Sequence, residues 1–257
     1  CNQFCSYCII PYARGRVRSR AIEDVVKEVE GLAKSGYREV VLTGIHLSSY
    51  GLIENYNSGF EHNHLLELIE AVARVQGIDR IRLGSLEPQI ITEAFASRLA
   101  KVDKICPHFH LSLQSGCDAT LKRMNRKYTA AEYEAGCVML RKYFDAPAIT
   151  TDVIVGFPGE TEEEFETTKE YVDYIGFYEM HIFKYSKRKG TKAAVMPDQV
   201  DEKIKTRRSD ILLTLEDAMS HAYRQSYVGR EVEVLFETPW EWDGRSYYTG
   251  YTREYIR

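Results

Sequence analysis

Short apolar runs alternate with segments of helical period along most of this chain of 257 residues. This alternation is typical of parallel strands joined by helical crossovers. Strands are expected at 39–43, 81–83, 108–113, 149–155 and 178–183, and helices at 21–35, 65–75, 93–102, 118–124, 130–143, 161–174 and 201–227. About 250 residues is a typical size for a barrel of this kind. The sequence therefore predicts an α/β fold, a partial or complete TIM-like barrel of parallel strands with outer helices.

The pattern changes near Gly229 to short alternating segments, EVEVLFE and SYYTGYTREYI, with the turn-like EWDG between them. Two or three strands alone would be marginally stable. We therefore expect 228–257 to be the beginning of a small C-terminal β-barrel that follows a core domain at 1–227.

Composition limits the possible partners and location. The net charge of -4 argues against general attraction to nucleic acid, so such contact requires a local basic patch or a part outside this chain. We find no signal peptide and no apolar run long enough to span a bilayer. We expect a protein of the reducing cytoplasm with no membrane partner.

Three cysteines lie within the first eight residues, CNQFCSYC. Cys1, Cys5 and Cys8 can hold three corners of a four-iron, four-sulfur (4Fe-4S) cluster, whose irons prefer thiolate ligands. The fourth iron is then free to bind a substrate. Since a domain rarely starts on a metal ligand, we expect that the chain is a fragment with residues upstream of Cys1.

Zinc and a disulfide are the alternatives for these cysteines. Structural zinc is usually closed by four ligands, but the nearest histidine, His46, falls in a different predicted element. The remaining cysteines show no framework spacing that indicates disulfides, and they are expected to be buried small side chains. They are Cys106, Cys117 and Cys137.

Ligands of parallel α/β folds bind at the carboxyl ends of the strands. Four successive strand ends carry Gly or polar residues, in GIHLSSYG, GSLEP, QSG and GFPGE. Each residue alone is explained as a turn residue, but their joint placement indicates a ligand site. Side chains that can bond a ribose, an adenine or a carboxylate there are Ser85, Glu87, Ser112 and Gln114.

Histidines and arginines surround the same predicted rim. His110 is in phase with Ser112 and is either a ligand-facing or a hydrogen-bonded interior side chain, while His46 directly follows a strand end. Two basic groups are either solvated faces or anion sites for a carboxylate or an RNA phosphate. They are Arg14, Arg16, Arg18 and Arg20 after the cysteines, and Lys122, Arg123, Arg126 and Lys127, with Tyr128, after QSG.

Several of these segments together resemble the methylthiotransferases of the radical S-adenosylmethionine superfamily. The segments are the cysteine motif, IIPYARGRVRSR, LTGIHLSSYG, SLEP, HLSLQSG, LKRMNRKYT and TDVIVGFPGET. The variant TGIHLSSYG resembles the group that acts on N6-threonylcarbamoyladenosine beside the tRNA anticodon. Relatives that act on isopentenyladenosine or on ribosomal protein S12 usually carry a Gln-containing version.

The resemblance implies a radical S-adenosylmethionine core, with Cys1, Cys5 and Cys8 as ligands of the 4Fe-4S cluster. The open iron would chelate S-adenosylmethionine, whose cleavage gives a radical that opens the adenine C2 position to sulfur insertion and methylation. The implied cofactor contacts are Thr43, Gly44, Ile45, Ser85, Glu87, Ser112, Gln114, Asp152 and Gly156. The implied substrate contacts are Arg14, Arg16, Arg18, Arg20, His46 and Arg126.

Family members also carry an N-terminal domain with a second 4Fe-4S cluster and a C-terminal RNA-binding TRAM barrel. By resemblance, the first is absent from this chain and the second is represented by its first strands. The implied partners are tRNA and a reductant protein such as a flavodoxin or ferredoxin. The alternatives left open are an isopentenyladenosine tRNA or ribosomal protein S12 methylthiotransferase, and a non-catalytic metal-containing RNA-binding module.

Overall fold

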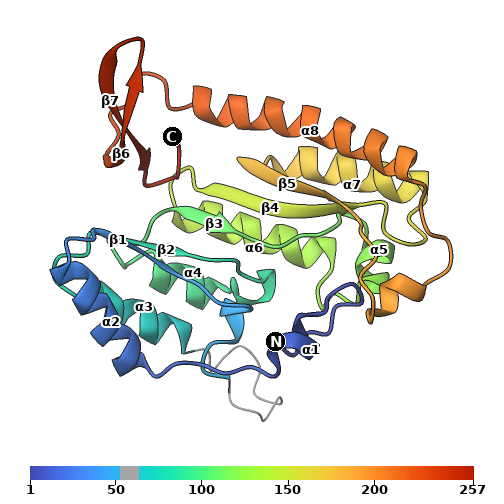
Figure 1. Ribbon diagram of the computed structural model, residues 1–257, viewed down its shortest axis with the longest axis horizontal. Coiled ribbons are helices and arrows are strands. Elements are labelled where there is room, and N and C mark those ends of the chain that lie inside the picture. The colour runs from blue at the N-terminus through green and yellow to red at the C-terminus, as the bar shows by residue number, and fades with distance from the viewer. Residues whose placement is uncertain (53–63) are drawn as a thin grey trace.

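A computed structural model describes residues 1–52 and 64–257 (Figure 1). The core strands are β1 Glu39–Leu42, β2 Arg80–Leu83, β3 His108–His110, β4 Ala148–Val155 and β5 Glu179–Lys184. The helices are α1 Ile10–Arg14, α2 Ile22–Lys34, α3 Leu65–Ala73, α4 Glu93–Leu99, α5 Asp118–Arg123, α6 Ala130–Tyr143, α7 Glu162–Ile175 and α8 Glu202–Gln225, with short 3-10 turns η1 Leu47–Ser49, η3 Pro88–Ile90 and η4 Lys192–Val195. The predicted alternation of strands and helices is confirmed.

The core strands lie in the order in which they occur in the chain, and they are parallel. β1 pairs with β2, and β3, β4 and β5 form a second ladder. Backbone bonds from Leu86 to His110 (2.8 Å) and from Ser112 to Leu86 (3.2 Å) join the two ladders. A sequential order is typical of barrels and differs from the reversed order of doubly wound sheets. Among the described residues the barrel is partial, since β1 and β5 are not paired.

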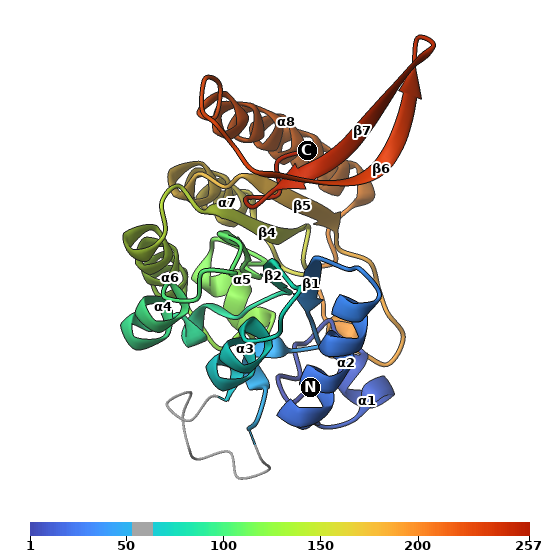
Figure 2. The ribbon, with the colours of Figure 1, turned by 90° about the vertical axis from the view of Figure 1, so that its left-hand side faces the viewer.

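The strands have one face against the helices and one inner face. Buried Ile149 and Val153 of β4 belong to the apolar core, and the Tyr133 hydroxyl of α6 reaches the Thr151 hydroxyl at 3.2 Å. Because strand side chains alternate, Thr150, Asp152 and Ile154 face the opposite side. Figure 2 shows α3, α4, α6 and α7 along one side of the strands. The inner face is therefore available to the site.

Helix boundaries follow capping chemistry. Thr161 caps α7 and forms a capping box with Glu164, as the sequence predicts, and Gly176 ends this helix with a φ of 66°. The structure adds α1, which the sequence analysis missed because five residues are too short to show a helical period. No helix in the described ranges is both long and apolar enough to cross a membrane.

A hairpin follows α8, formed by β6 Val234–Trp242 and β7 Arg245–Thr252. Asp243 (φ 49°) and Gly244 (φ 69°) form its two-residue turn, in agreement with the prediction from EWDG. The end of β7 is bound to the inner face of β2, where the Arg82 guanidinium donates to the carbonyl oxygens of Thr252 and Arg253, each at 2.8 Å. The hairpin is thus attached to the core.

His108 lies next to this attachment, and its burial should make the stability of the protein depend on pH. Its ring lies against that of Tyr255, with the centroids 5.1 Å apart and the planes tilted by 35°, and burial, helped by Arg82 and His110, lowers its pKa to about 3. The folded protein therefore keeps His108 neutral at pH values where the unfolded chain, with a pKa of about 6.5, takes up a proton. Stability is lost as the pH falls below about 6.5, and we expect His108 to account for up to about 2 kcal/mol of unfolding free energy between pH 7 and pH 5.

Urea unfolding of a cluster-free Cys5→Ala background at both pH values measures this loss. His108→Phe in the same background should show a pH dependence weaker by this amount. Equal pH dependence in the two proteins would show that His108 is not responsible.

Candidate functional site

The predicted cysteine ligands lie together on one loop. Cys1, Cys5 and Cys8 are free, half-buried thiols. The loop turns between Cys5 and Cys8, where the Cys8 amide donates to the Cys5 carbonyl at 3.0 Å. Asn125, just after α5, donates to the Phe4 carbonyl at 2.8 Å. The fold therefore fixes the loop backbone and leaves the thiols available as ligands.

The spacing of the thiols tests what they can hold. In the part of the chain that the structure describes, the one group of three metal-ligating side chains whose ligand atoms lie within 4.8 Å of one another is His110, Asp152 and His181. The three thiols do not form such a group. A single tetrahedral zinc with bonds of about 2.3 Å needs its sulfurs about 3.8 Å apart. Thiolates on different irons of one cluster lie farther apart, so the arrangement fits a 4Fe-4S cluster better than a mononuclear zinc site.

A buried ionic network lies beside this loop. Both carboxylate oxygens of Glu87 accept from Arg126 at 2.8 Å, and His46 lies 3.6 Å from the same carboxylate. The side chains of Glu87 and Arg126 are 13% and 7% exposed. Burial raises the pKa of Glu87, but Arg126 and His46 outweigh burial, and the net pKa is lowered. Glu87 therefore stays ionised at neutral pH.

The network reaches the cysteine loop through Arg126. Its Nη1 lies 3.4 Å from the Cys5 sulfur, and its Nε donates to the Tyr128 hydroxyl at 2.9 Å. The prediction of a substrate contact by Arg126 is not favoured by this placement, because the guanidinium is buried and already paired. Tyr128, which ends the second basic group of the sequence analysis, belongs to the same network.

The segment after β1 and the arginines meet at one hollow of about 740 Å³. A Cβ at Gly44 would meet nothing within 4 Å, so this position has open space for a ligand. The predicted residues that line the hollow are Cys1, Arg14, Arg16, Arg18, Arg20, Thr43, Gly44, Ile45 and His46. Arg14, Arg16 and Arg18 are exposed, whereas Arg20 pairs with Glu28.

The other predicted cofactor contacts lie along the next strand ends. Gln114 has a φ of 72° and its amide donates to the Asp152 carbonyl at 2.8 Å. Ser85 is exposed and Ser112 is half-buried. A Cβ on Gly156, whose φ is 70°, would lie 2.2 Å from the Lys205 Cγ. Packing against α8 therefore explains this glycine without a ligand.

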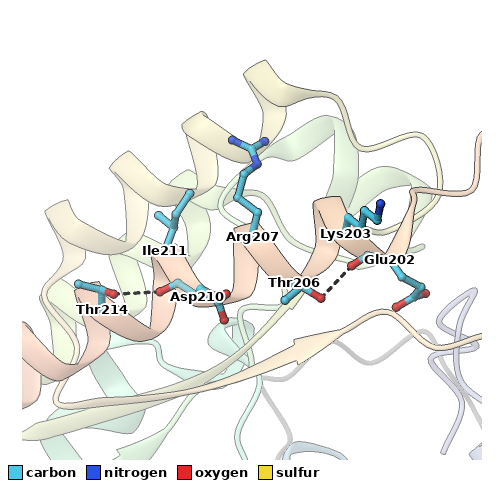
Figure 3. Close-up of a pocket in the computed structure, with 7 residues that line it drawn as sticks. All are labelled: Glu202, Lys203, Thr206, Arg207, Asp210, Ile211 and Thr214. Atoms are coloured by element: carbon cyan, nitrogen blue, oxygen red, sulfur yellow. Dashed lines mark hydrogen bonds between the residues drawn. The ribbon is translucent and has the colours of Figure 1, made fainter.

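Another surface hollow lies along α8 (Figure 3). The hydroxyls of Thr206 and Thr214 donate to the Glu202 and Asp210 carbonyls of their own helix, at 2.9 and 3.0 Å. None of the predicted site residues lines this hollow. The cysteine loop and the strand ends therefore remain the candidate site.

A sequentially wound α/β sheet with three free cysteines above its strand ends defines a radical S-adenosylmethionine domain. The family model described as "Radical SAM superfamily" matches residues 1–172, and the chain belongs to this superfamily. A solved structure with the same fold is that of the radical S-adenosylmethionine methyltransferase TsrM from Kitasatospora setae, with cobalamin and a [4Fe-4S] cluster bound. It gives a TM-score of 0.62 at 19% identity, over 76% of this chain and 37% of that chain.

Within the superfamily, the chain is similar to tRNA methylthiotransferases. It is 43% identical to the threonylcarbamoyladenosine tRNA methylthiotransferase MtaB of Bacillus subtilis, over 100% of this chain and 56% of that protein. It is 42% identical to the tRNA-2-methylthio-N(6)-dimethylallyladenosine synthase of Alkaliphilus oremlandii, over 93% of this chain and 50% of that protein. The chain thus spans about half the length of the curated relatives that it matches.

Proposed function

We propose that this chain is the core of a tRNA methylthiotransferase that places a methylthio group on C2 of N6-threonylcarbamoyladenosine beside the anticodon. The observation that carries this proposal is the set of three free thiols on one loop beside the hollow lined by Thr43 to His46. The 43% identity to the Bacillus subtilis enzyme supports the acceptor. The dimethylallyladenosine acceptor is the second possibility, and the 42% identity to the Alkaliphilus oremlandii synthase supports it.

Each group of site residues has a separate proposed role, according to its position. Cys1, Cys5 and Cys8 would hold the 4Fe-4S cluster, which when bound and reduced supplies the electron that cleaves S-adenosylmethionine. Thr43 to Ile45 would bind the methionine end of the cofactor, because this segment lies beside Cys1 at the hollow. Ser112 and Gln114 would orient its ribose and adenine.

Exposed arginines on the hollow are suited to the RNA. Arg14, Arg16 and Arg18 would contact tRNA phosphates, because guanidinium groups bind phosphate oxygens well. We also propose that the β6–β7 hairpin begins a TRAM-like module and that the intact protein has a second cluster in an N-terminal domain. A flavodoxin or ferredoxin would supply electrons, in the cytoplasm where tRNA is modified.

Mass spectrometry of digested tRNA tests the acceptor. The full-length protein, expressed in a strain that lacks its own methylthiotransferases, should restore the methylthio group on threonylcarbamoyladenosine. A Cys5→Ala variant of the same protein is the matched control and should restore nothing. Methylthiolation of dimethylallyladenosine instead would establish the second acceptor. Modification of ribosomal protein S12, or no deoxyadenosine from anaerobically reduced protein, would refute both tRNA readings.

A further inference from the structure

Three polar side chains form a row on the inner face of adjacent strands. His110 lies on β3, Asp152 on β4 and His181 on β5, and Asp152 is the direct register partner of His181. The sequence analysis missed His181. The predicted strand at 178–183 contains this residue, and its pairing with Asp152 places both side chains on the same face of the sheet. We call these residues the inner row.

Hydrogen bonding fixes part of the inner row. The Nε2 of His110 lies 3.3 Å from Oδ2 of Asp152, and its Nδ1 lies 3.0 Å from the Thr150 hydroxyl. The Thr150 hydroxyl and the Asp152 carboxylate lie against opposite nitrogens of the ring, and together they hold His110 in one orientation.

The rest of the inner row is free to bind. His181 is exposed, and its ring stacks on that of His110 with centroids 6.0 Å apart. Within 1–52 and 64–257, no hydrogen-bond partner is found for the His181 nitrogens or for the second oxygen of Asp152. The row thus offers one carboxylate oxygen as an acceptor and an imidazole that can donate.

The inner row lies directly below the predicted cofactor contacts. Ser112 follows His110 by two residues on the same face, which corresponds to about 7 Å along an extended chain. Ile154 follows Asp152 by the same step on β4. A nucleoside that presents its adenine C2 to the cofactor at the strand ends can therefore extend its N6 substituent along the inner face to the row.

We propose that the inner row is the binding site for a polar, hydrogen-bonding N6 substituent of the acceptor adenosine. This inference rests on the proposed function and narrows its substrate. The threonylcarbamoyl group carries urea N–H donors, a hydroxyl and a carboxylate. In this assignment Asp152, which the resemblance implies as a cofactor contact, instead accepts from the urea N–H groups, and His181 donates to the carboxylate.

An apolar substituent does not fit this row. A dimethylallyl group has no hydrogen-bonding atom, so its binding would remove water from Asp152 and His181 without replacing the lost hydrogen bonds. A site built for hydrogen bonds rejects an analogue that lacks them far more strongly than an apolar pocket rejects an extra group. The two relatives at 43% and 42% identity do not separate these acceptors, whereas the inner row does.

Nucleoside binding tests the row independently of turnover. The full-length, cluster-loaded protein with S-adenosylmethionine is titrated with N6-threonylcarbamoyladenosine and with N6-dimethylallyladenosine. We expect at least about tenfold tighter binding of the first, and we expect His181→Phe to lose that preference. His221→Phe, an equivalent change at an exposed position on α8, should keep it.

Three results would overturn the proposal. The first is equal binding of both nucleosides by the unchanged protein. The second is a preference for threonylcarbamoyladenosine that persists in His181→Phe. The third is a bound metal ion that is present in the unchanged protein and lost in His181→Phe. Iron content should stay at the unchanged level in His181→Phe, and both iron content and deoxyadenosine formation should stay at that level in His221→Phe. If the preference is found but tRNA is not methylthiolated, the proposed function fails while the binding site stands.

Discussion

Replacing Cys5 by alanine should abolish iron and sulfide uptake and reduce S-adenosylmethionine cleavage to the level without protein. Cys5 is one of three free thiols on the loop, and two thiolates cannot replace three at the cluster. The fold should survive, since the apolar core is built from strand and helix residues and includes none of the three loop cysteines. Iron and sulfide analysis after anaerobic reconstitution, deoxyadenosine assay and circular dichroism measure the three outcomes.

Cys117→Ala is the matched control for this prediction. Cys117 is a buried thiol at the start of α5, and its removal should leave the iron content unchanged. If Cys5→Ala retained a full complement of iron and sulfide, the ligand assignment would be wrong. If it unfolded the protein, the loop would be part of the stabilising core.

The second large effect is expected from Arg126→Leu. This change leaves Glu87 buried beside His46 without its arginine, and loss of one partner of a buried ion pair costs about 3–5 kcal/mol. Because the pKa of Glu87 is lowered, the carboxylate is charged at pH 7, where urea unfolding should be measured. The double variant Arg126→Leu/Glu87→Leu should recover part of the loss, since it removes the unpaired charge.

The stability loss in Arg126→Leu should be compared with that caused by breaking an exposed ion pair. Arg207 pairs with Glu162 at 2.6 Å on the surface, and Arg207→Leu should cost less than about 1 kcal/mol. If Arg126→Leu were as mild as Arg207→Leu, the buried network would not contribute to stability. A double variant no more stable than the single one would show that the cost does not come from the unpaired carboxylate.

The fold was largely predictable because its local signals agree with its packing. Parallel strands leave short apolar runs such as VVL in β1, and Thr161 marks a helix start by its capping chemistry. The partners within the site were not predictable from local pattern. Arg126 meets Glu87 across 39 residues of sequence and Cys5 across 121, and no local spacing encodes such contacts.

The same reasoning applies to two single positions of the predicted site. Arg126 was grouped with neighbouring basic residues as a surface contact, but its contacts with Glu87 and Tyr128 bury it. Gly156 was predicted to serve a ligand, but the side chain of Lys205 occupies the space that a Cβ would need. Long-range packing decides both cases, and a sequence alone does not contain it.

The attachment of the hairpin to β2 determines how ligands reach the inner face. Arg82 binds the backbone carbonyls of Thr252 and Arg253, and its guanidinium lies 4.7 Å from the centre of the Tyr255 ring. The C-terminal segment therefore covers the inner face of β2 at this point. The attachment leaves entry from the cysteine side open as a route to the inner row. A stacked base in an RNA loop is too deeply enclosed to travel that route, so the acceptor nucleotide must swing out of its stack before it enters.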